Sequence, residues 1–292
     1  MAKRKKKVAN SRSAHDRAAR GSLPKVVDDA KDGASSLNKM LGILDLFTPT
    51  TPMWSTNDLI RALESSRSTA YRYIKVLNRS GLISAVGNGY YVLGPRIVEL
   101  DLQIRTCDPL HLAGRGILEQ LVEATGLSAL MCMLFRNSVL CIREHRAPLS
   151  PENLFSRGQR RSLFKGAMSK VILAHLPTHR LRSIYLRHPD AVAQANLGQS
   201  WDEFRDALTN IRKEGHVMSQ GEFRPGVAGV AAPVFNSDQM ILGSVGVAWQ
   251  LAELRDVDIA RATLAAKRAA REISQRLATT MKGMDLPPRA VG

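Results

Sequence analysis

The residues with the clearest chemistry lie in the stretch SRSTAYRYIKVLNRSGL, at positions 66–82. Apolar residues recur there at the i, i+3, i+4, i+7 spacing that predicts one buried stripe of an α-helix: Ala70, Tyr73, Ile74 and Leu77. The opposite side of the same helix combines cations with hydroxyl groups and carries no carboxylate: Ser68, Tyr71, Arg72, Lys75 and Arg79. Because Arg and Lys neutralise phosphates, this side is a candidate surface for nucleic acid.

Positions along this helix predict different contacts with DNA. Hydroxyl groups at the helix start can donate to a phosphate, and the helix N-terminus favours an anion there. Tyr71 and Arg72, one turn further, are placed to reach base edges in a major groove. The predicted DNA-contacting residues are Arg67, Ser68, Thr69, Tyr71, Arg72 and Lys75 from the helix, and Asn88 from the turn that follows it. The alternative for each residue taken alone is a solvated surface position.

The neighbouring elements are those needed to position such a helix. An apolar helix is predicted over residues 35–47, and a second begins with Ser55 as its N-cap, shortly before the helix that starts at Ser66. Gly87-Asn88-Gly89 then separates two short strands, which is a strong hairpin pattern. Helix, helix, tight turn, helix and hairpin in this order predict a winged helix-turn-helix. A three-helix cap on an enzyme is the alternative.

Charge and composition point to the same class of partner. The chain has 292 residues, a formal charge of +16 and a pI of about 10.3. This length indicates about two domains, and the charge favours an acidic polymer as partner. Residues 1–33 hold ten basic and four acidic residues, and we predict a disordered tail that adds non-specific nucleic-acid affinity. Its KRKKK run can also be interpreted as a nuclear import signal.

Several classes of protein are disfavoured by what the sequence lacks. No apolar run follows the early charges as in a signal peptide, and none is long enough to span a membrane. Cys107, Cys132 and Cys141 lack CxxC spacing, which fits a reducing compartment and argues against a disulfide framework or a zinc site. We therefore expect a cytoplasmic protein without metal or cofactor.

The pattern after the hairpin is a mixture of helices and strands. A helix over residues 95–107 has an apolar stripe at Ile97, Leu100 and Ile104, so it can join two domains and pack against its counterpart in a second subunit. The following predictions are one helix at 110–125, a hairpin at 128–145, a polar loop and apolar helix ending at Pro177, three strands between 216 and 249, and an Ala-rich helix at 257–280. Together they predict a sheet flanked by helices.

The same region offers one constellation that resembles a catalytic site. Cys132, Cys141, Glu144 and His145 can be imagined as a nucleophile and its base. If the hairpin turns at Asn137, however, Cys141 opposes a residue other than Cys132, and the two thiols lie on different faces; a one-residue slip in register would undo this argument. No nucleophile elbow, zinc-protease, P-loop or dinucleotide motif is present. We therefore expect no enzymatic activity.

Three blocks of the chain resemble the IclR family of bacterial transcription regulators. The first contains SLNKMLGILDLF, STNDLIRAL, SRSTAYRYIKVLNRSGLI and GYYVLGPRIVEL. The second, GQRRSLFKGAMSKVILAHLP, is similar to the family's effector-domain loop and helix, with Lys170 in the place of its usual Gly-Lys. The third is IRKEGHVMSQGEFRPGVAGVAAPVF, through Ile211, Arg212, Gly215, Glu222, Gly226, Ala232 and Pro233. The blocks occur in order over about residues 35–250, which makes the resemblance specific.

The resemblance implies an α+β fold with an N-terminal winged helix-turn-helix, a linker helix and a C-terminal GAF-like α/β effector-binding domain. The implied parts are a basic tail (1–33), a DNA-binding domain (34–94), a linker helix (95–107) and an effector-binding and oligomerisation domain (108–292). Such a protein is a sequence-specific regulator in the bacterial nucleoid, controlled by a small carboxylate effector. It acts as a homodimer or homotetramer on double-stranded DNA with a near-palindromic operator. A non-specific architectural DNA binder is a further alternative, which predicts neither operator preference nor effector response.

The resemblance also implies where the effector binds. Its pocket is implied to be bordered by Ala167, Met168, Ser219, Val227, Gly229, Gly246 and Ala248. Gly229, Gly246 and Ala248 stand where some relatives carry Cys or Ser, which favours a bulkier, less polar ligand such as an aromatic acid, and hence control of aromatic-compound catabolism. The alternative is a compensating polar group, for example Ser219 or Ser244.

Charged groups near this pocket have more than one interpretation. The helix start at 165–168 would supply backbone N–H groups for a carboxylate. Arg160, Arg161 and Lys165 can add positive charge there or be ordinary surface cations. For Glu222, a structural role that closes the loop between Gly221 and Gly226 is favoured over ligand contact, because a buried carboxylate is costly unless it is hydrogen-bonded.

Overall fold

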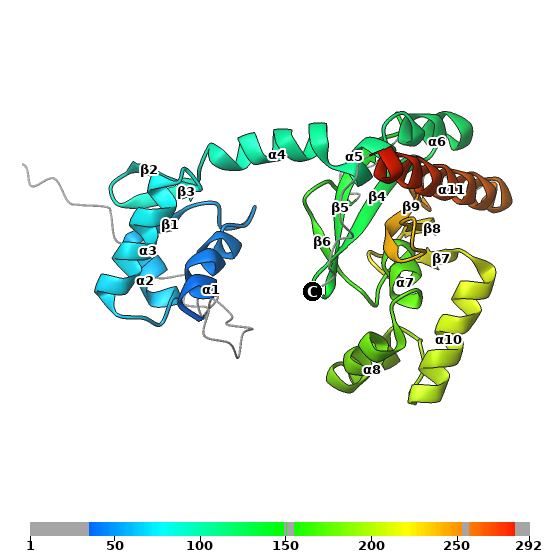
Figure 1. The fold of residues 1–292 in the computed structure, drawn as a ribbon. Helices are drawn as coiled ribbons and strands as arrows, with labels where there is room; N and C mark the ends of the chain where they lie inside the picture. Colours follow the sequence, from blue (N-terminus) through cyan, green and yellow to red (C-terminus); the bar gives the residue numbers. More distant parts are fainter. Residues whose placement is uncertain (1–34, 149, 151–154, 253–256, 284–292) are drawn as a thin grey trace, which may run out of the picture. The chain divides into compact units, whose positions relative to one another are not determined.

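The structure is a computed structural model that describes residues 35–148, 150, 155–252 and 257–283 of the chain. The predicted basic tail at 1–33 lies outside the described residues. The chain divides into two compact units, Met1–Gln103 and Ile104–Gly292, which are drawn in sequence colours in Figure 1. No helix in the described part of the chain is long and apolar enough to cross a membrane.

The first unit consists of short helices and a small antiparallel sheet. Its elements are α1 (Ser35–Gly42), the 3₁₀ helix η1 (Ile43–Leu46), β1 (Trp54–Ser55), α2 (Thr56–Ala62), α3 (Arg67–Arg79), β2 (Ile83–Gly87) and β3 (Tyr90–Leu93). The helix α4 (Arg96–Cys107) begins in this unit and ends in the second. The sheet order is β1-β3-β2, with both pairs antiparallel. Two helices joined by a tight turn and followed by a β-ribbon form a winged helix-turn-helix.

The predicted amphipathic helix is α3. Ser66 is its N-cap, and the Ser66 hydroxyl accepts a hydrogen bond from the Thr69 amide at 3.2 Å. The four residues of the predicted apolar stripe are buried: Ala70, Tyr73, Ile74 and Leu77. They belong to a core that also contains Ile43, Leu59 and Ile83. The periodicity therefore identified the buried side of the helix correctly.

Two features of this unit differ from the sequence prediction. Trp54 and Ser55 form a third strand of the sheet, because Trp54 is 2% exposed and its indole N–H donates to the Leu46 carbonyl at 2.9 Å. The α1 helix gives way to the tighter η1 turn, so Ile43 and Leu46 are buried and Leu37 remains exposed. Long-range packing has overridden the local pattern in both cases.

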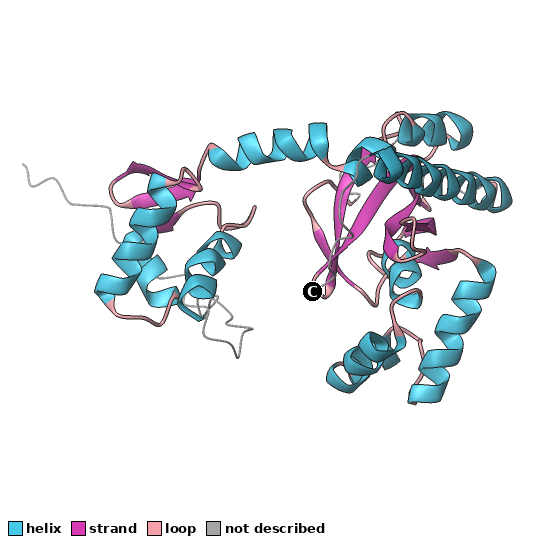
Figure 2. Cartoon of the chain, viewed as in Figure 1, coloured by secondary structure: helices cyan, strands magenta, loops and turns pink. Residues whose placement is uncertain are grey.

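The second unit is a six-stranded antiparallel sheet with helices on both faces (Figure 2). Its helices are α5 (Pro109–Ala113), α6 (Ile117–Thr125), α7 (Ala167–Ala174), α8 (Thr178–Arg187), α9 (Pro189–Gln194), α10 (Trp201–Glu214) and α11 (Ile259–Gly283). Its strands are β4 (Ser128–Phe135), β5 (Ser138–His145), β6 (Arg160–Ser162), β7 (Val217–Gln220), β8 (Val227–Phe235) and β9 (Ile241–Gln250), in the order β6-β5-β4-β9-β8-β7. One core lies between the sheet and α5, α6 and α11, and another between the sheet and α7, α8 and α10.

The predicted helix at 110–125 is interrupted. It is broken into α5 and α6 by Gly114, Arg115 and Gly116, and Gly116 has φ 79°, a left-handed conformation that suits glycine. The segment predicted as a polar loop before α7 contains the short edge strand β6, which pairs with β5. A three-residue strand is too short for its periodicity to be recognised.

The predicted register of the β4–β5 hairpin is wrong near its turn. The turn consists of Arg136 and Asn137, and a bulge next to Met131 shifts the pairing by one residue. Cys132 and Cys141 therefore oppose each other directly, whereas the sequence analysis placed them on different faces. Both are fully buried on the same side of the sheet.

Candidate DNA-contacting helix and effector cavity

The predicted DNA-contacting residues of α3 gather on its exposed side. Five of them are exposed: Arg67, Ser68, Tyr71, Arg72 and Lys75. Thr69 is partly buried, and its hydroxyl accepts a hydrogen bond from Ser66 Oγ at 2.9 Å. Thr69 therefore belongs to the N-terminal cap of the helix as well as to this surface.

This side of α3 carries uncompensated positive charge. Arg72, Lys75 and Arg79 form no ion pair with any residue that the structure describes. The Arg67 guanidinium lies 5.9 Å from the centroid of the Tyr71 ring, one helical turn away, within the range of a cation–π contact. The cations are thus available to phosphates and base edges.

The predicted wing residue Asn88 lies at the tip of the β2–β3 hairpin. Asn88 has φ 51° and Gly89 has φ 73°, the left-handed pair that a two-residue turn requires. The Thr56 amide and the Thr56 hydroxyl both donate to the Gly89 carbonyl at 2.8 Å. This turn is therefore fixed to the start of α2, and the exposed Asn88 has a defined position.

Most residues implied for effector binding border one small cavity between α7 and the sheet. Its lining includes Ala167, Met168, Ser219, Val227, Gly229 and Ala248. Gly246 does not border it; a Cβ at Gly246 would lie 1.9 Å from the Val230 carbonyl oxygen, so close strand packing requires glycine there. The cavity volume is about 30 Å³, room for a water molecule or two. Ligand pockets usually exceed roughly 300 Å³, so this cavity is closed to an organic ligand.

The N-terminus of α7, which was expected to bind a carboxylate of the effector, is occupied by groups of the protein itself. The Gly166 amide donates to Glu222 Oε2 at 3.0 Å, and the Ala167 amide donates to Ser219 Oγ at 2.8 Å. Glu222 thus supplies the negative charge that a helix N-terminus favours. Sequence reasoning missed these bonds because their partners are more than 50 residues apart in the chain.

Glu222 also holds a buried cation. Lys170 is 7% exposed, and its ammonium group donates to Glu222 Oε1 at 2.8 Å and to the Ala195 carbonyl at 2.9 Å. A buried charge of this kind is tolerated only when it is paired and hydrogen-bonded. The structure therefore gives Glu222 a structural role. Its bonds connect the β7–β8 loop to α7, whereas the sequence predicted contacts within the loop alone.

Arg161 is the one cation of the three considered that borders the cavity, whereas Arg160 and Lys165 are exposed. Its guanidinium carbon lies 3.4 Å from the ring centroid of Phe155 and 3.4 Å from that of Phe223. Its Nε is buried without a hydrogen-bond partner in the described part of the chain. Burial lowers the pKa of Arg161 to about 10, which still leaves it charged at neutral pH.

The two rings around Arg161 are site residues that sequence reasoning did not find. Phe155 follows β5 by a loop, and Phe223 lies between β7 and β8, so neither belongs to a periodic pattern. Their ring centroids are 6.0 Å apart. The available clue was an aromatic residue next to the matched Glu222, in a chain with only 5% aromatic residues.

The corrected register does not create a catalytic cysteine. Burial raises the pKa of the Cys132 thiol well above its usual value, and a hydrogen bond with Cys141 adds to this rise. A nucleophilic cysteine requires the opposite shift, toward the thiolate. The two thiols are therefore best explained as core residues.

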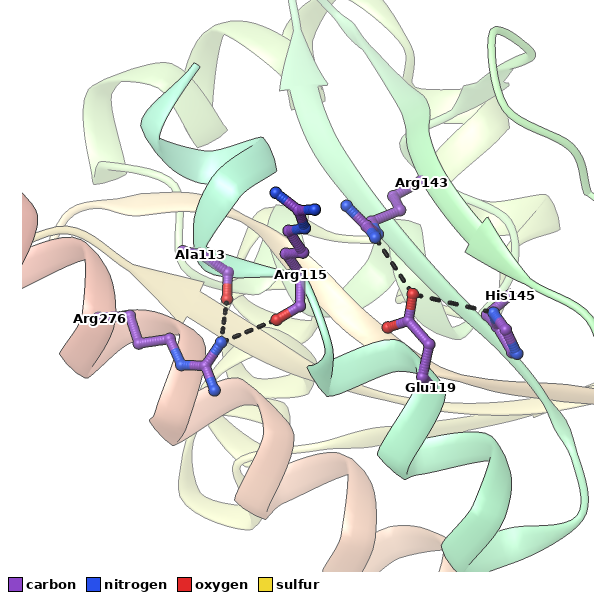
Figure 3. A network of polar contacts seen from close by, with 6 residues as sticks. All are labelled: Ala113, Arg115, Glu119, Arg143, His145 and Arg276. Atoms are coloured by element: carbon purple, nitrogen blue, oxygen red, sulfur yellow. Dashed lines mark hydrogen bonds and ion pairs between the residues drawn. The ribbon is translucent and has the colours of Figure 1, made fainter. Parts of the chain in front are cut away.

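The candidate base His145 is the last residue of β5 and belongs to the polar network drawn in Figure 3, which does not include the two cysteines. Its Nδ1 lies 3.9 Å from Glu119 Oε1, and Arg143 Nη2 donates to the same oxygen at 3.2 Å. In the same view, Arg276 Nη1 of α11 donates to the Arg115 carbonyl at 2.8 Å, just after α5. These contacts fasten α5 and α6 to the rest of the unit. No group of three or more metal-ligating side chains occurs among the described residues.

Fold and site together define a class: a DNA-binding protein with a winged helix-turn-helix and an α/β domain that contains a small cavity. Comparison with known proteins gives the family. The family model described as "Bacterial transcriptional regulator IclR C-terminal" matches residues 108–275, and the "IclR helix-turn-helix domain" matches residues 36–87. The chain belongs to the IclR family of transcriptional regulators, as the sequence resemblance predicted. It is a DNA-binding regulator and not an enzyme.

Individual relatives are distant but cover most of the chain. The HTH-type transcriptional regulator XynR of Escherichia coli is 24% identical over 226 residues, which is 77% of this chain and 90% of XynR. The crystal structure of an IclR transcriptional regulator from Alicyclobacillus acidocaldarius has a TM-score of 0.72 at 22% identity, and covers 83% of this chain and 98% of that one. An IclR homologue from Microbacterium hydrocarbonoxydans, crystallised with 4-hydroxybenzoate, has a TM-score of 0.65 at 19% identity, with coverage of 83% and 98%. The predicted α+β fold with a GAF-like second domain is confirmed by this likeness.

Proposed function

We propose that this regulator binds a near-palindromic operator through α3 and the β2–β3 turn, and that a small carboxylate bound in the second unit controls this binding. The observation that carries the proposal is the exposed side of α3, where Arg72, Lys75 and Arg79 face solvent without a carboxylate partner among the described residues. Tyr71, 47% exposed beside them, supplies a group for base or sugar contact. Asn88 is in place for a contact by the wing.

A second copy of the chain is part of this proposal. The apolar side chains of α4 include Val98, 68% exposed, and Leu102, 59% exposed, and α4 buries none of its residues. Leu37 and Leu41 of α1 are also exposed. Apolar helix surfaces of this kind favour association, which supports a homodimer or homotetramer. In this assignment residues 34–94 bind DNA, 95–107 link, and 108–292 bind effector and assemble. The near-palindromic operator follows from the two-fold symmetry of a dimer.

The effector is proposed to be an aromatic acid. Gly229 and Ala248 border the cavity without polar side chains, and Ser219 is already bonded to the Ala167 amide. Few donors are therefore left for the hydroxyl or keto groups of a small aliphatic acid. The likeness in fold to a homologue that was crystallised with 4-hydroxybenzoate supports the same choice. Such a regulator works at the bacterial nucleoid.

The proposal is tested by sequencing the genomic DNA fragments that the full-length protein retains, with and without a pool of aromatic acids. We expect enrichment of one inverted-repeat motif, with half-sites about one or two helical turns apart, and a change in its recovery when the acids are present. Equal recovery of all fragments would identify a non-specific architectural binder. Enrichment of one motif whose recovery no acid changes would contradict effector control and support the DNA-binding part of the proposal.

A further inference from the structure

Arg161 is a largely enclosed cation for which the described structure provides no anion. Its guanidinium is held between Phe155 and Phe223, and its contacts with the two rings neutralise none of its charge. No carboxylate of the described residues pairs with Arg161, and its buried Nε remains unbonded. Leaving such a group without a partner is costly, and structures usually reserve such a cost for a functional group.

The start of α7, which lies next to Arg161, already has its own anion. A methyl group placed on Gly166 would lie 3.8 Å from Arg161 Nη1, so the guanidinium adjoins the positive N-terminus of α7. Glu222 compensates this helix start and Lys170, because its two oxygens are bonded to the Gly166 amide and to Lys170, and it forms no ion pair with Arg161.

Phe223 fills the space next to Arg161 at the edge of the cavity. It borders the cavity, and the same methyl group on Gly166 would lie 3.8 Å from its Cβ. The loop that carries Phe223 is bounded by Gly221 with φ 69° and Gly226 with φ 79°. Withdrawal of this one ring would enlarge a cavity that now has room for a water molecule or two, and would expose one face of the guanidinium.

We propose that Arg161 is the effector's carboxylate-binding residue, and that the ring of an aromatic acid takes up the space that Phe223 fills in the free protein. This inference rests on the proposed function and specifies it: the ligand is an anion with a planar apolar ring. Arg161 contributes one or two charge-assisted hydrogen bonds to the carboxylate, and Phe155 retains the other face of the guanidinium. Phe223 then acts as a stand-in that keeps Arg161 covered in the free protein.

The experiment measures binding of three probes to the full-length protein by calorimetry: benzoate, 4-hydroxybenzoate and the neutral analogue benzamide. Arg161→Met retains the apolar stem and removes the charge. The matched control is Arg160→Met, which removes an exposed cation from the adjacent position of β6. We expect Arg161→Met to weaken binding of the acids by about 10- to 100-fold, the usual effect of hydrogen bonds to a charged group. Arg160→Met should leave the affinity within about twofold.

The ratio of benzoate to benzamide affinity separates a charge role from a structural one. A purely structural Arg161 would lower both affinities together and leave the ratio unchanged, which would overturn the proposal. Phe223→Ala should tighten benzoate binding by roughly 2- to 20-fold, because the acid no longer displaces a ring from the guanidinium. Weaker benzoate binding in Phe223→Ala would contradict the stand-in role. Failure of the wild type to bind either acid would overturn the inference as a whole.

Operator binding in the presence of each acid distinguishes this inference from the proposed function. If pyruvate, an aliphatic acid, alters operator affinity equally in wild type and Arg161→Met, effector control stands and the role of Arg161 fails. If benzoate binds through Arg161 and leaves operator affinity unchanged, the binding residue is correct and effector control by this acid fails.

Discussion

Removal of the Glu222 side chain should destabilise the second unit strongly, because Glu222 has two partners that would be left buried. The perturbation is Glu222→Ala. It deletes the acceptor of the Gly166 amide at 3.0 Å and the counter-ion of Lys170 at 2.8 Å. Lys170 would retain the Ala195 carbonyl as its remaining described partner.

The magnitude follows from the burial of the two partners. Breaking a buried ion pair by removing one member costs about 3–5 kcal/mol. The side chain of Glu222 is 30% exposed, so water can replace part of the lost interaction. We therefore expect a loss of roughly 2–3 kcal/mol in the free energy of unfolding. The control is Asp202→Ala, which breaks an exposed pair with Arg205 and should cost under about 1 kcal/mol.

The assay is urea denaturation of the full-length protein, followed by hydrogen exchange in peptides from α7 and β8 so that the second unit is observed separately. The double variant Glu222→Gln with Lys170→Met removes both charges, while the amide oxygen introduced by the first substitution can still accept from the Gly166 N–H. It should recover most of the stability, with a coupling energy of about 1–3 kcal/mol. A Glu222→Ala protein as stable as the Asp202→Ala control would refute the reasoning, since Lys170 would then not depend on Glu222.

Four further outcomes are expected. Arg72→Ala should weaken operator binding by about 1–3 kcal/mol in a gel-shift titration if Arg72 contacts a base, and unchanged affinity would show that α3 is not the recognition helix. Deletion of residues 1–33 should lower the salt dependence of binding to all DNA sequences alike, whereas a selective loss at the operator would contradict a non-specific tail. Burial lowers the pKa of His175, so as the pH falls the unfolded chain binds a proton at this residue before the folded protein does. Stability should therefore fall as the pH decreases below about 6.5, and thermal unfolding of His175→Gln should show a shallower fall. Arg276→Ala should weaken the response of operator affinity to effector while effector affinity measured by calorimetry stays unchanged; an unchanged response would remove α5 from the coupling.

Local patterns predicted those parts of the structure that depend on local interactions. The buried stripe of α3 from Ala70 to Leu77 needed only a helical period, and Asn88-Gly89 needed only a left-handed turn. The β4–β5 register failed because a bulge next to Met131 inserts one residue, and no sequence pattern records such an insertion. Trp54 lies in the sheet because its side chain is buried against the surrounding helices, which is a tertiary contact.

The candidate effector site shows the same division between local and long-range contacts. Family resemblance identified positions that border the cavity, such as Ala167 and Ser219, because they lie in short matched blocks. It was wrong in assigning the N-terminus of α7 to the carboxylate of an effector, because the Gly166 amide is bonded to the carboxylate of Glu222, 56 residues away. The stacking of Phe155 and Phe223 on Arg161 joins segments from three parts of the chain. Contacts of this kind are set by the tertiary fold, and composition and spacing do not reveal them.

The small volume of the cavity sets a requirement on how an effector can act. A ligand shifts a conformational equilibrium only by its difference in affinity between two arrangements, and the cavity in the arrangement described here, at about 30 Å³, is too small to hold an organic acid. Binding must therefore move Phe223 and the loop between Gly221 and Gly226. That loop continues into β8, which packs against α11, and Arg276 of α11 is bonded to the carbonyl of Arg115 directly after α5. Movement of the loop thus has a continuous set of packed elements through which it can bias α5, the helix that follows α4 in the chain.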